Sequence, residues 1–211
     1  MERIRCEADL AAGTAALIAA EPRFGEAVEA AGPPPLRLRP GGFAALMKLI
    51  VEQQVSVASG NAIWARIEAA GATTPEAVLA RDPDALRALG LSRPKAAYAR
   101  ALSEAVLAGE VCFVRQAALP YDEAAAELVA VKGIGRWTAE LYHLACEGRA
   151  DLLPVGDIAL QEAARALFGL PERPSAKAFE ALGAPWSPWR SVAARILWSY
   201  YRVLKGREGK A

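Results

Sequence analysis

Apolar residues along this chain recur mainly at intervals of three and four positions, which is the period of a helix with one buried face. The clearest run consists of Phe43, Leu46, Met47 and Ile50, which stand at i, i+3, i+4 and i+7. No segment shows sustained alternation of apolar and polar residues with an excess of β-branched side chains, the pattern of a half-buried strand. The sequence therefore predicts an all-α fold.

Residues that favour helix ends divide this pattern into separate helices. Ser92 is expected to cap a helix over about 93–108, and Asp122 to cap a later one. Ser187, followed by a proline, predicts that the last helix begins near residue 188. Glycine and proline dominate only one longer stretch, residues 32–42, and this composition favours an extended link between two lobes.

Composition narrows the class of protein. Apolar residues make up 54% of the 211 positions, which is enough for a buried core. No apolar run reaches the roughly 20 residues that a membrane span needs. The first ten residues, MERIRCEADL, lack the apolar centre of a secretory signal. Three widely spaced cysteines fit neither a disulfide framework nor a metal site. These features predict a cytoplasmic protein with no membrane partner.

The net charge of +1 argues against nucleic-acid binding through overall charge, because such domains are usually evidently basic. A local basic face remains compatible with this balance. Candidates for that face are Lys132 with Arg136, and Arg93 with Lys95.

The most informative stretch begins with a helical hairpin at Gly133-Ile134-Gly135. Glycine accepts φ > 0 and leaves backbone N–H groups accessible, and a helix N-terminus follows directly. Such a turn is suited to binding a phosphate. An aromatic residue, Trp137, comes just after the hairpin, and a carboxylate, Asp157, follows a proline-containing loop.

Two carboxylates in that loop, Asp151 and Asp157, compete for a chemical role. Asp157 is also a good N-cap for the apolar helix after it, so a purely structural role remains open. His143 is the only histidine, and it has no nucleophile pattern around it. No phosphate-binding loop, dinucleotide fingerprint or pair of metal-binding histidines is present.

The hairpin segment VKGIGRWTAELYHLA, followed by LLPVGDIALQEAAR, resembles the helix-hairpin-helix, Gly-Pro-Asp (HhH-GPD) DNA glycosylase superfamily, in particular its 3-methyladenine DNA glycosylase II type. Three further stretches agree with this family in its order. They are IVEQQVSVASGNAIWARI at 50–67, LGLSRPKAAYARALSEAV at 89–106 and PWRSVAARILW at 188–198. A Gly-x-Gly hairpin alone is common among DNA-binding proteins, whereas all five stretches in sequence are specific.

The resemblance implies a two-lobed helical bundle with a DNA cleft between the lobes. Lobe A is expected to consist of residues 1–40 and 146–211, and lobe B of residues 41–145. It also implies a monomer that acts on double-stranded DNA containing damaged bases and associates with the nucleoid of a prokaryote.

The resemblance assigns Asp157 as the catalytic residue, which stabilises the oxocarbenium character that develops when an N-glycosidic bond breaks. The dipole of the following helix favours its ionised form. Trp137 and Trp198 match the base pocket, with Leu141 and Tyr142 beside them, although the pocket tyrosine of the type member falls at Leu141. In members that also nick the strand, a lysine forms a Schiff base at the position of Trp137. The resemblance therefore implies a monofunctional glycosylase with no lyase activity.

The remaining implied roles concern the DNA backbone and base flipping. The residues expected at the DNA backbone are Lys132, Gly133, Ile134, Gly135, Arg136 and Thr138. The wedge that fills the gap behind a flipped base is assigned to Gln54 or its neighbour Gln53, for which an exposed polar turn is the alternative interpretation. No cofactor and no metal held by side chains is expected. The hairpin carbonyls are implied to hold a Na⁺ or K⁺ ion.

The function predicted from these residues is excision of alkylated purines of the 3-methyladenine and 7-methylguanine type, which starts base excision repair. Two alternatives stay open at this point. One is a non-catalytic helix-hairpin-helix DNA-binding module, and the other is a glycosylase for deaminated or oxidised bases.

Overall fold

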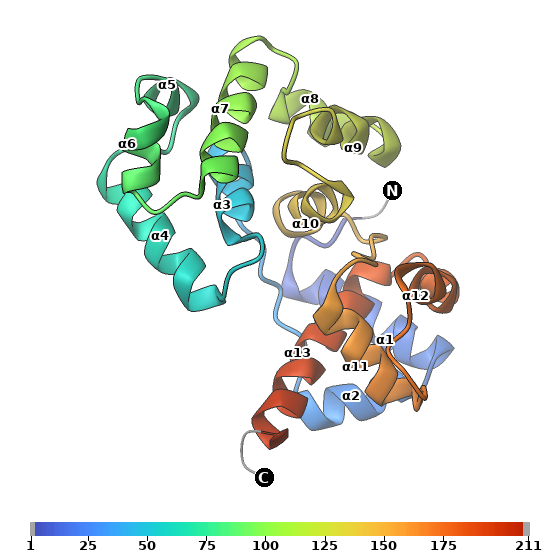
Figure 1. Cartoon of the computed structure of the whole chain (residues 1–211). Helices are drawn as coiled ribbons and strands as arrows, with labels where there is room; N and C mark the ends of the chain where they lie inside the picture. Colours follow the sequence, from blue (N-terminus) through green and yellow to red (C-terminus); the bar gives the residue numbers. More distant parts are fainter. Residues whose placement is uncertain (1–2, 209–211) are drawn as a thin grey trace. The chain divides into compact units, whose positions relative to one another are not determined.

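The computed structural model describes residues 3–208, and within that range it is helical apart from turns, loops and a single bridge between Arg3 and Arg149. Figure 1 shows the helices in chain order. They are α1 (Glu7–Ala20), α2 (Arg23–Ala31), α3 (Phe43–Glu52), α4 (Val57–Ala69), α5 (Pro75–Leu79), α6 (Pro83–Ala88), α7 (Arg93–Leu107), α8 (Phe113–Ala118), α9 (Tyr121–Val129), α10 (Arg136–Cys146), α11 (Ile158–Phe168), α12 (Ala176–Gly183), the 3₁₀ turn η1 (Ala184–Trp186) and α13 (Arg190–Glu208). The prediction of an all-α fold is confirmed.

The helices form two compact units. The first unit joins the chain up to Leu38 with the chain from His143 onward, and the second runs from Arg39 to Tyr142. One division falls inside the glycine- and proline-rich link, and the other falls within α10. The lobe boundaries expected from the sequence stood a few residues further along at each point.

In the first unit, α13 packs against α1, α2 and α11. Its side chains at Val192, Ala193 and Ile196 are buried. Gly13 of α1 allows a close approach, because a Cβ there would meet Trp189 at 2.6 Å and Val192 at 2.9 Å. The apolar side chains of α13 therefore lie at the centre of this unit.

Arg195 of α13 ties the extended link to the helices of the first unit. It is 3% exposed, and its guanidinium donates to the carbonyls of Leu36, Leu144 and Ser191, each at 3.1 Å. Burial lowers the pKa of Arg195 to about 10, so it is still charged at neutral pH. The link cannot form helical hydrogen bonds through its prolines, and this arginine binds one of its carbonyls instead.

In the second unit, α3 contacts both α4 and α7, and α7 also packs against α5 and α6. The predicted apolar face of α3 is buried at Phe43, Leu46, Met47 and Ile50. This confirms the helical period inferred from these four residues.

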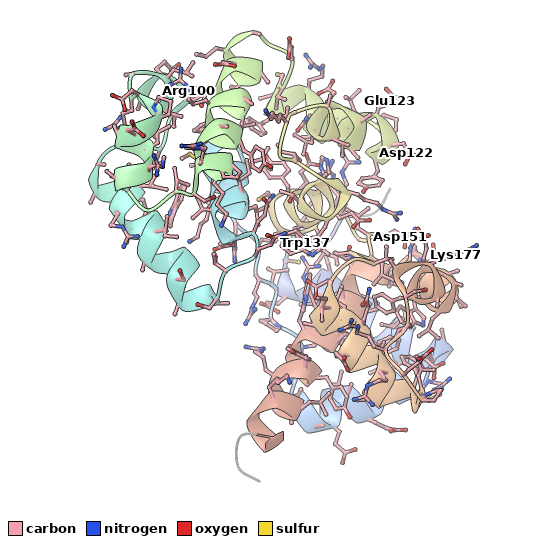
Figure 2. The ribbon with its side chains drawn as sticks, viewed as in Figure 1. Arg100, Asp122, Glu123, Trp137, Asp151 and Lys177 are labelled. Atoms are coloured by element: carbon pink, nitrogen blue, oxygen red, sulfur yellow. The ribbon has the colours of Figure 1, made fainter. Side chains whose placement is uncertain are left out.

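Ser92 caps α7 as expected, because its side chain accepts a hydrogen bond from the N–H of Lys95. The starts predicted at Asp122 and near residue 188 were wrong. The N-cap of α9 is Pro120, and Asp122 lies exposed in the first turn (Figure 2). Aspartate is favoured both at the cap and in the first turn, where it meets the positive end of the helix dipole. The last helix begins at Arg190, because residues 186–189 form a turn in which the N–H of Trp189 donates to Trp186.

Among the residues that the structure describes, no helix has both the length and the apolar character needed to cross a membrane.

We expect Arg195→Met to lower the free energy of unfolding by about 2–4 kcal/mol, because it leaves buried carbonyls without their donor. Urea unfolding at neutral pH measures this. Arg165→Met is the matched control, since Arg165 makes a surface ion pair with Glu162 at 2.9 Å and its loss is expected to cost less than about 1 kcal/mol. Equal losses in the two variants would contradict a structural role for Arg195.

Candidate functional site

The hairpin between α9 and α10 is held from inside the second unit. Ile134 is buried, and its N–H donates to the carbonyl of Val131 at 3.0 Å. Gly133 has φ 93°, and a Cβ at this position would overlap the ring of Tyr98 from α7. The accessible surface of the hairpin therefore comes from its other residues, Lys132 and Gly135, which are exposed.

A single side chain joins this hairpin to the end of α3. The amide Nε2 of Gln53 donates to the carbonyl of Gly133 at 3.1 Å and to Oγ1 of Thr138 at 3.0 Å. Thr138 is 2% exposed, so its side chain serves this internal contact, and this argues against the expected DNA contact. The same contact argues against Gln53 as a wedge, because its amide is already engaged.

Gln54 differs from Gln53 in its exposure and in its backbone conformation. Its side chain is exposed, and its backbone has φ 54°, a left-handed conformation that is uncommon for a residue with a Cβ. Unlike Gln53, it projects from the turn between α3 and α4. Of the two glutamines, Gln54 has the geometry expected of a wedge.

The first turns of α10 carry two residues that the sequence analysis assigned to base recognition, Trp137 and Leu141. Trp137 is half-buried near the start of this helix (Figure 2), and Leu141 is half-buried one turn later. Nε of Arg136 forms an ion pair with Oε1 of Glu140 at 2.8 Å, while the arginine side chain stays 60% exposed. Arg136 therefore keeps an accessible guanidinium at the hairpin.

Tyr142 was expected beside the base pocket, and its contacts argue against that. It is 2% exposed, its hydroxyl accepts a hydrogen bond from the N–H of Gly42 at 2.8 Å, and its ring lies 5.6 Å from that of Phe113. The resemblance placed the tyrosine of the type member at Leu141, and Tyr142, one position further along the helix, is directed into the core of the second unit.

In the first unit, Asp151 is occupied by a basic partner. Nε of Arg190 donates to Oδ1 at 2.6 Å, Nη2 donates to Oδ2 at 2.9 Å, and Oγ of Ser187 donates to Oδ2 at 2.8 Å. Burial alone would raise the pKa of Asp151, but the hydrogen bonds from Arg190 and Ser187 outweigh it and lower that pKa. This bidentate ion pair attaches the loop that carries Asp151, labelled in Figure 2, to the start of α13.

Asp157 stands at the start of α11, as the sequence predicted. Its Oδ1 accepts a hydrogen bond from the N–H of Leu160 at 3.1 Å, which confirms the N-cap. The loop before it is closed by the N–H of Asp157 itself, which donates to Pro154 at 2.9 Å. Nε2 of Gln161 donates to the carbonyl of Val155 at 2.7 Å. The carboxylate is half-buried, in a hydrogen-bonded loop at the positive end of a helix dipole.

The remaining candidates, Trp198 and His143, both lie in the first unit. Trp198 is half-buried on α13 in the first unit. His143 is buried, with Nδ1 3.1 Å from Oε2 of Glu147, a carboxylate that also accepts from Arg149 at 2.6 Å. This network is structural. Within residues 3–208, no group of three or more His, Cys, Asp or Glu side chains is placed to hold a metal ion.

Residues 47–188 match the family model for the HhH-GPD superfamily of base excision DNA repair proteins. The matched region contains the hairpin and Asp157. The chain belongs to this family.

Individual HhH-GPD proteins resemble the chain over most of its length. DNA-3-methyladenine glycosylase 1 of Schizosaccharomyces pombe is 29% identical over 161 residues, which cover 74% of this chain and 71% of that protein. The structure of a DNA-3-methyladenine glycosidase from Bacillus halodurans is 33% identical, with a TM-score of 0.78 over 90% of this chain and 89% of that one. The S. pombe 3-methyladenine DNA glycosylase Mag1, solved in complex with abasic DNA, is 25% identical, with a TM-score of 0.82 over 88% and 94%.

We expect Gly133→Ala to destabilise the protein by about 2–4 kcal/mol, because the new Cβ combines an unfavourable φ with overlap against Tyr98. Thermal or urea unfolding measures the loss. Gly135→Ala is the matched control two residues away, since a Cβ there meets no other atom within 4 Å. A loss in Gly135→Ala as large as that in Gly133→Ala would contradict this account of the hairpin.

Proposed function

We propose that this HhH-GPD protein is a monofunctional DNA glycosylase that removes alkylated purines, of the 3-methyladenine and 7-methylguanine type, from double-stranded DNA. The relatives named 3-methyladenine DNA glycosylases, at 25–33% identity over most of the chain, support this activity. The match to the acid of this family assigns the catalytic role to Asp157, whereas the other carboxylate of the loop, Asp151, is held by Arg190 and Ser187.

Asp151 cannot easily serve a reaction, since its two oxygens are bonded to Arg190 and Ser187. Asp157 uses Oδ1 for a helix cap, and a carboxylate has further acceptor positions on both oxygens. Cap and catalyst are therefore compatible roles for this residue. The closed loop around Asp157 limits its motion, which favours a catalyst that must meet a sugar at a fixed position.

The proposed chemistry is hydrolysis of the N-glycosidic bond. As that bond breaks, its electron pair leaves with the base, and positive charge develops on the deoxyribose. The carboxylate of Asp157 stabilises this charge and accepts a proton from the water that attacks C1′. An N-alkylated purine is cationic and already a good leaving group, so the reaction does not depend on a separate general acid.

DNA binding is assigned to the hairpin of the second unit. Exposed Lys132 and Arg136 supply positive charge, and Gly135 leaves its backbone accessible at the start of α10. The relative solved with abasic DNA supports DNA as the partner. A local basic group of this kind reconciles DNA binding with a net charge of only +1.

Recognition of the base is assigned to Trp137, with Leu141 one turn further along the same helix, and to Trp198 on α13. Indole rings attract cationic groups over their faces, and alkylated purines carry such a charge. Both tryptophans are half-buried, so part of each ring is accessible. Tyr142 is not assigned to base recognition, because its hydroxyl and ring contact Gly42 and Phe113.

We further propose that the protein acts as a monomer and needs no cofactor. The Na⁺ or K⁺ ion implied for the hairpin fits only part of its backbone. The carbonyl of Gly133 already accepts from Gln53, and that of Gly135 accepts from the N–H of Ala139 at 3.1 Å. The carbonyl of Lys132 is therefore the proposed ligand on the hairpin, and such an ion would add positive charge beside a DNA phosphate.

Asp157→Asn is expected to abolish release of free base from methylated DNA while DNA binding persists. Asparagine keeps the helix cap, so the fold is expected to remain. Chromatography of bases released from methylated duplex DNA, together with a binding assay, measures both properties.

Asp151→Asn is the matched control in the same loop, and it is expected to retain base release even where it loses stability. Full activity of Asp157→Asn would contradict the catalytic assignment. DNA binding by the wild-type protein without release of any base would indicate a non-catalytic binding module. Release of deaminated or oxidised bases alone would identify the other class of glycosylase.

Borohydride treatment during the reaction is expected to leave no covalent protein–DNA adduct. Trapping requires an imine between an amine and C1′, and the position that holds the lysine in strand-nicking members is Trp137 here. Gel electrophoresis of labelled substrate detects an adduct, with a strand-nicking glycosylase as the positive control. A trapped adduct would show that another amine attacks the sugar.

A further inference from the structure

The end of α3 is stabilised by a lysine from another helix. After Glu52 the chain turns through residues 53–56 and enters α4. The last carbonyls of a helix lack partners within that helix. Here Nζ of Lys95, on α7, donates to the carbonyls of Val51 and Gln53, both at 2.7 Å. Lys95 thus binds the backbone on the side of the turn that precedes Gln54.

The ammonium of Lys95 is partly withdrawn from water. Burial lowers the pKa of Lys95, which is consistent with a group that has exchanged hydration for protein carbonyls. A cation near the C-terminal end of a helix also interacts favourably with the helix dipole. The two hydrogen bonds of Lys95 therefore attach the end of α3 to α7, a contact that a fully hydrated surface lysine would not make.

The same turn has a second attachment. The side chain of Gln53 is bonded to Gly133 and Thr138 of the hairpin segment, while its carbonyl is bonded to Lys95. One helical turn beyond Lys95 on α7, the ring of Tyr98 lies against Gly133. These contacts form a closed ring from α7 to the turn, from the turn to the hairpin, and from the hairpin back to α7.

Gln54 follows directly on the residue that is held from both sides. Its φ of 54° is unfavourable for a side chain with a Cβ, and such conformations persist where the surroundings fix the backbone. Its side chain is exposed. The contacts of the turn thus keep the backbone of Gln54 in a left-handed conformation, from which a residue in an unattached loop would relax.

We propose that Lys95 is a positioning residue for base flipping, which holds the turn so that the exposed side chain of Gln54 can enter the gap left by a flipped base. This inference rests on the proposed function. Lys95 itself does not touch the reacting atoms. Its effect passes through the carbonyls of Val51 and Gln53 to the conformation of Gln54.

A role in flipping has a consequence that a general role in folding does not have. Extruding a base from a duplex requires unpairing and unstacking, whereas a single strand requires much less. Loss of a residue that positions the wedge should therefore slow base release from duplex DNA selectively. A loss of stability or of catalytic power would slow release from both substrates alike.

The experiment compares full-length wild type, Lys95→Met, Lys95→Arg and Lys48→Met on methylated DNA, as duplex and as single strand, in single-turnover reactions at saturating protein. Lys95→Met is expected to slow duplex release about tenfold or more and single-strand release less than about threefold. Lys95→Arg is expected to recover most of the duplex rate, because arginine also donates to carbonyls. Lys48 is the matched control, since it belongs to the same unit and lies over Trp64.

A second measurement reads flipping without chemistry. In the Asp157→Asn background, a duplex containing 2-aminopurine at the target position should gain fluorescence on binding, and addition of Lys95→Met should reduce that gain while the protein still binds. Melting curves check the fold of each variant. Gln53→Ala, which cuts the other attachment and leaves Lys95 in place, is expected to show the same duplex-selective loss and serves if Lys95→Met does not fold.

An unchanged ratio of duplex to single-strand rates in Lys95→Met and Gln53→Ala would overturn the inference, as would a change of the same size in Lys48→Met. Failure of the proposed function looks different. In that case the wild-type protein releases no base from either substrate, and the fluorescence measurement alone tests the role of Lys95.

Discussion

The amide of Gln53 is the contact on which the arrangement of the polar loops in the second unit depends. It joins the end of α3 to the helical hairpin through two hydrogen bonds, one to backbone and one to a side chain. Both loops consist of helix ends, whose backbone groups have no partners within their own helices. Because carbonyls of both turns accept hydrogen bonds from the side chains of Gln53 and Lys95, the two turns are attached to each other and to α7.

The loop before α11 shows how surroundings separate two identical side chains. Asp151 and Asp157 lie six positions apart and are the same chemical group. One is neutralised by the bidentate guanidinium of Arg190, and the other caps a helix through a backbone N–H. A clamp of the first kind stabilises the fold and removes a carboxylate from use. A cap of the second kind is compatible with a chemical role, because a carboxylate has several acceptor positions.

The two proposed tasks are carried by different units of the chain. Residues assigned to the DNA backbone and to the wedge belong to the second unit, whereas Asp157 belongs to the first. Each unit has its own buried centre, around α3 and α7 in one and around α13 in the other. The region that matches the HhH-GPD family model, residues 47–188, contains parts of both units.

The sequence by itself determined the all-α fold, the face of α3 and the caps at Ser92 and Asp157, because helical period and capping are local properties of neighbouring residues. The motifs also determined the family. Only the tertiary structure decided that Thr138 and Tyr142 turn inward, that Gln53 is bonded while Gln54 is exposed, and that Asp151 is clamped. Apart from the exposure of Gln54, those outcomes depend on partners far away along the chain, such as Ser187 for Asp151 and Thr138 for Gln53. The direction of a side chain is set by such partners, and no local pattern records them.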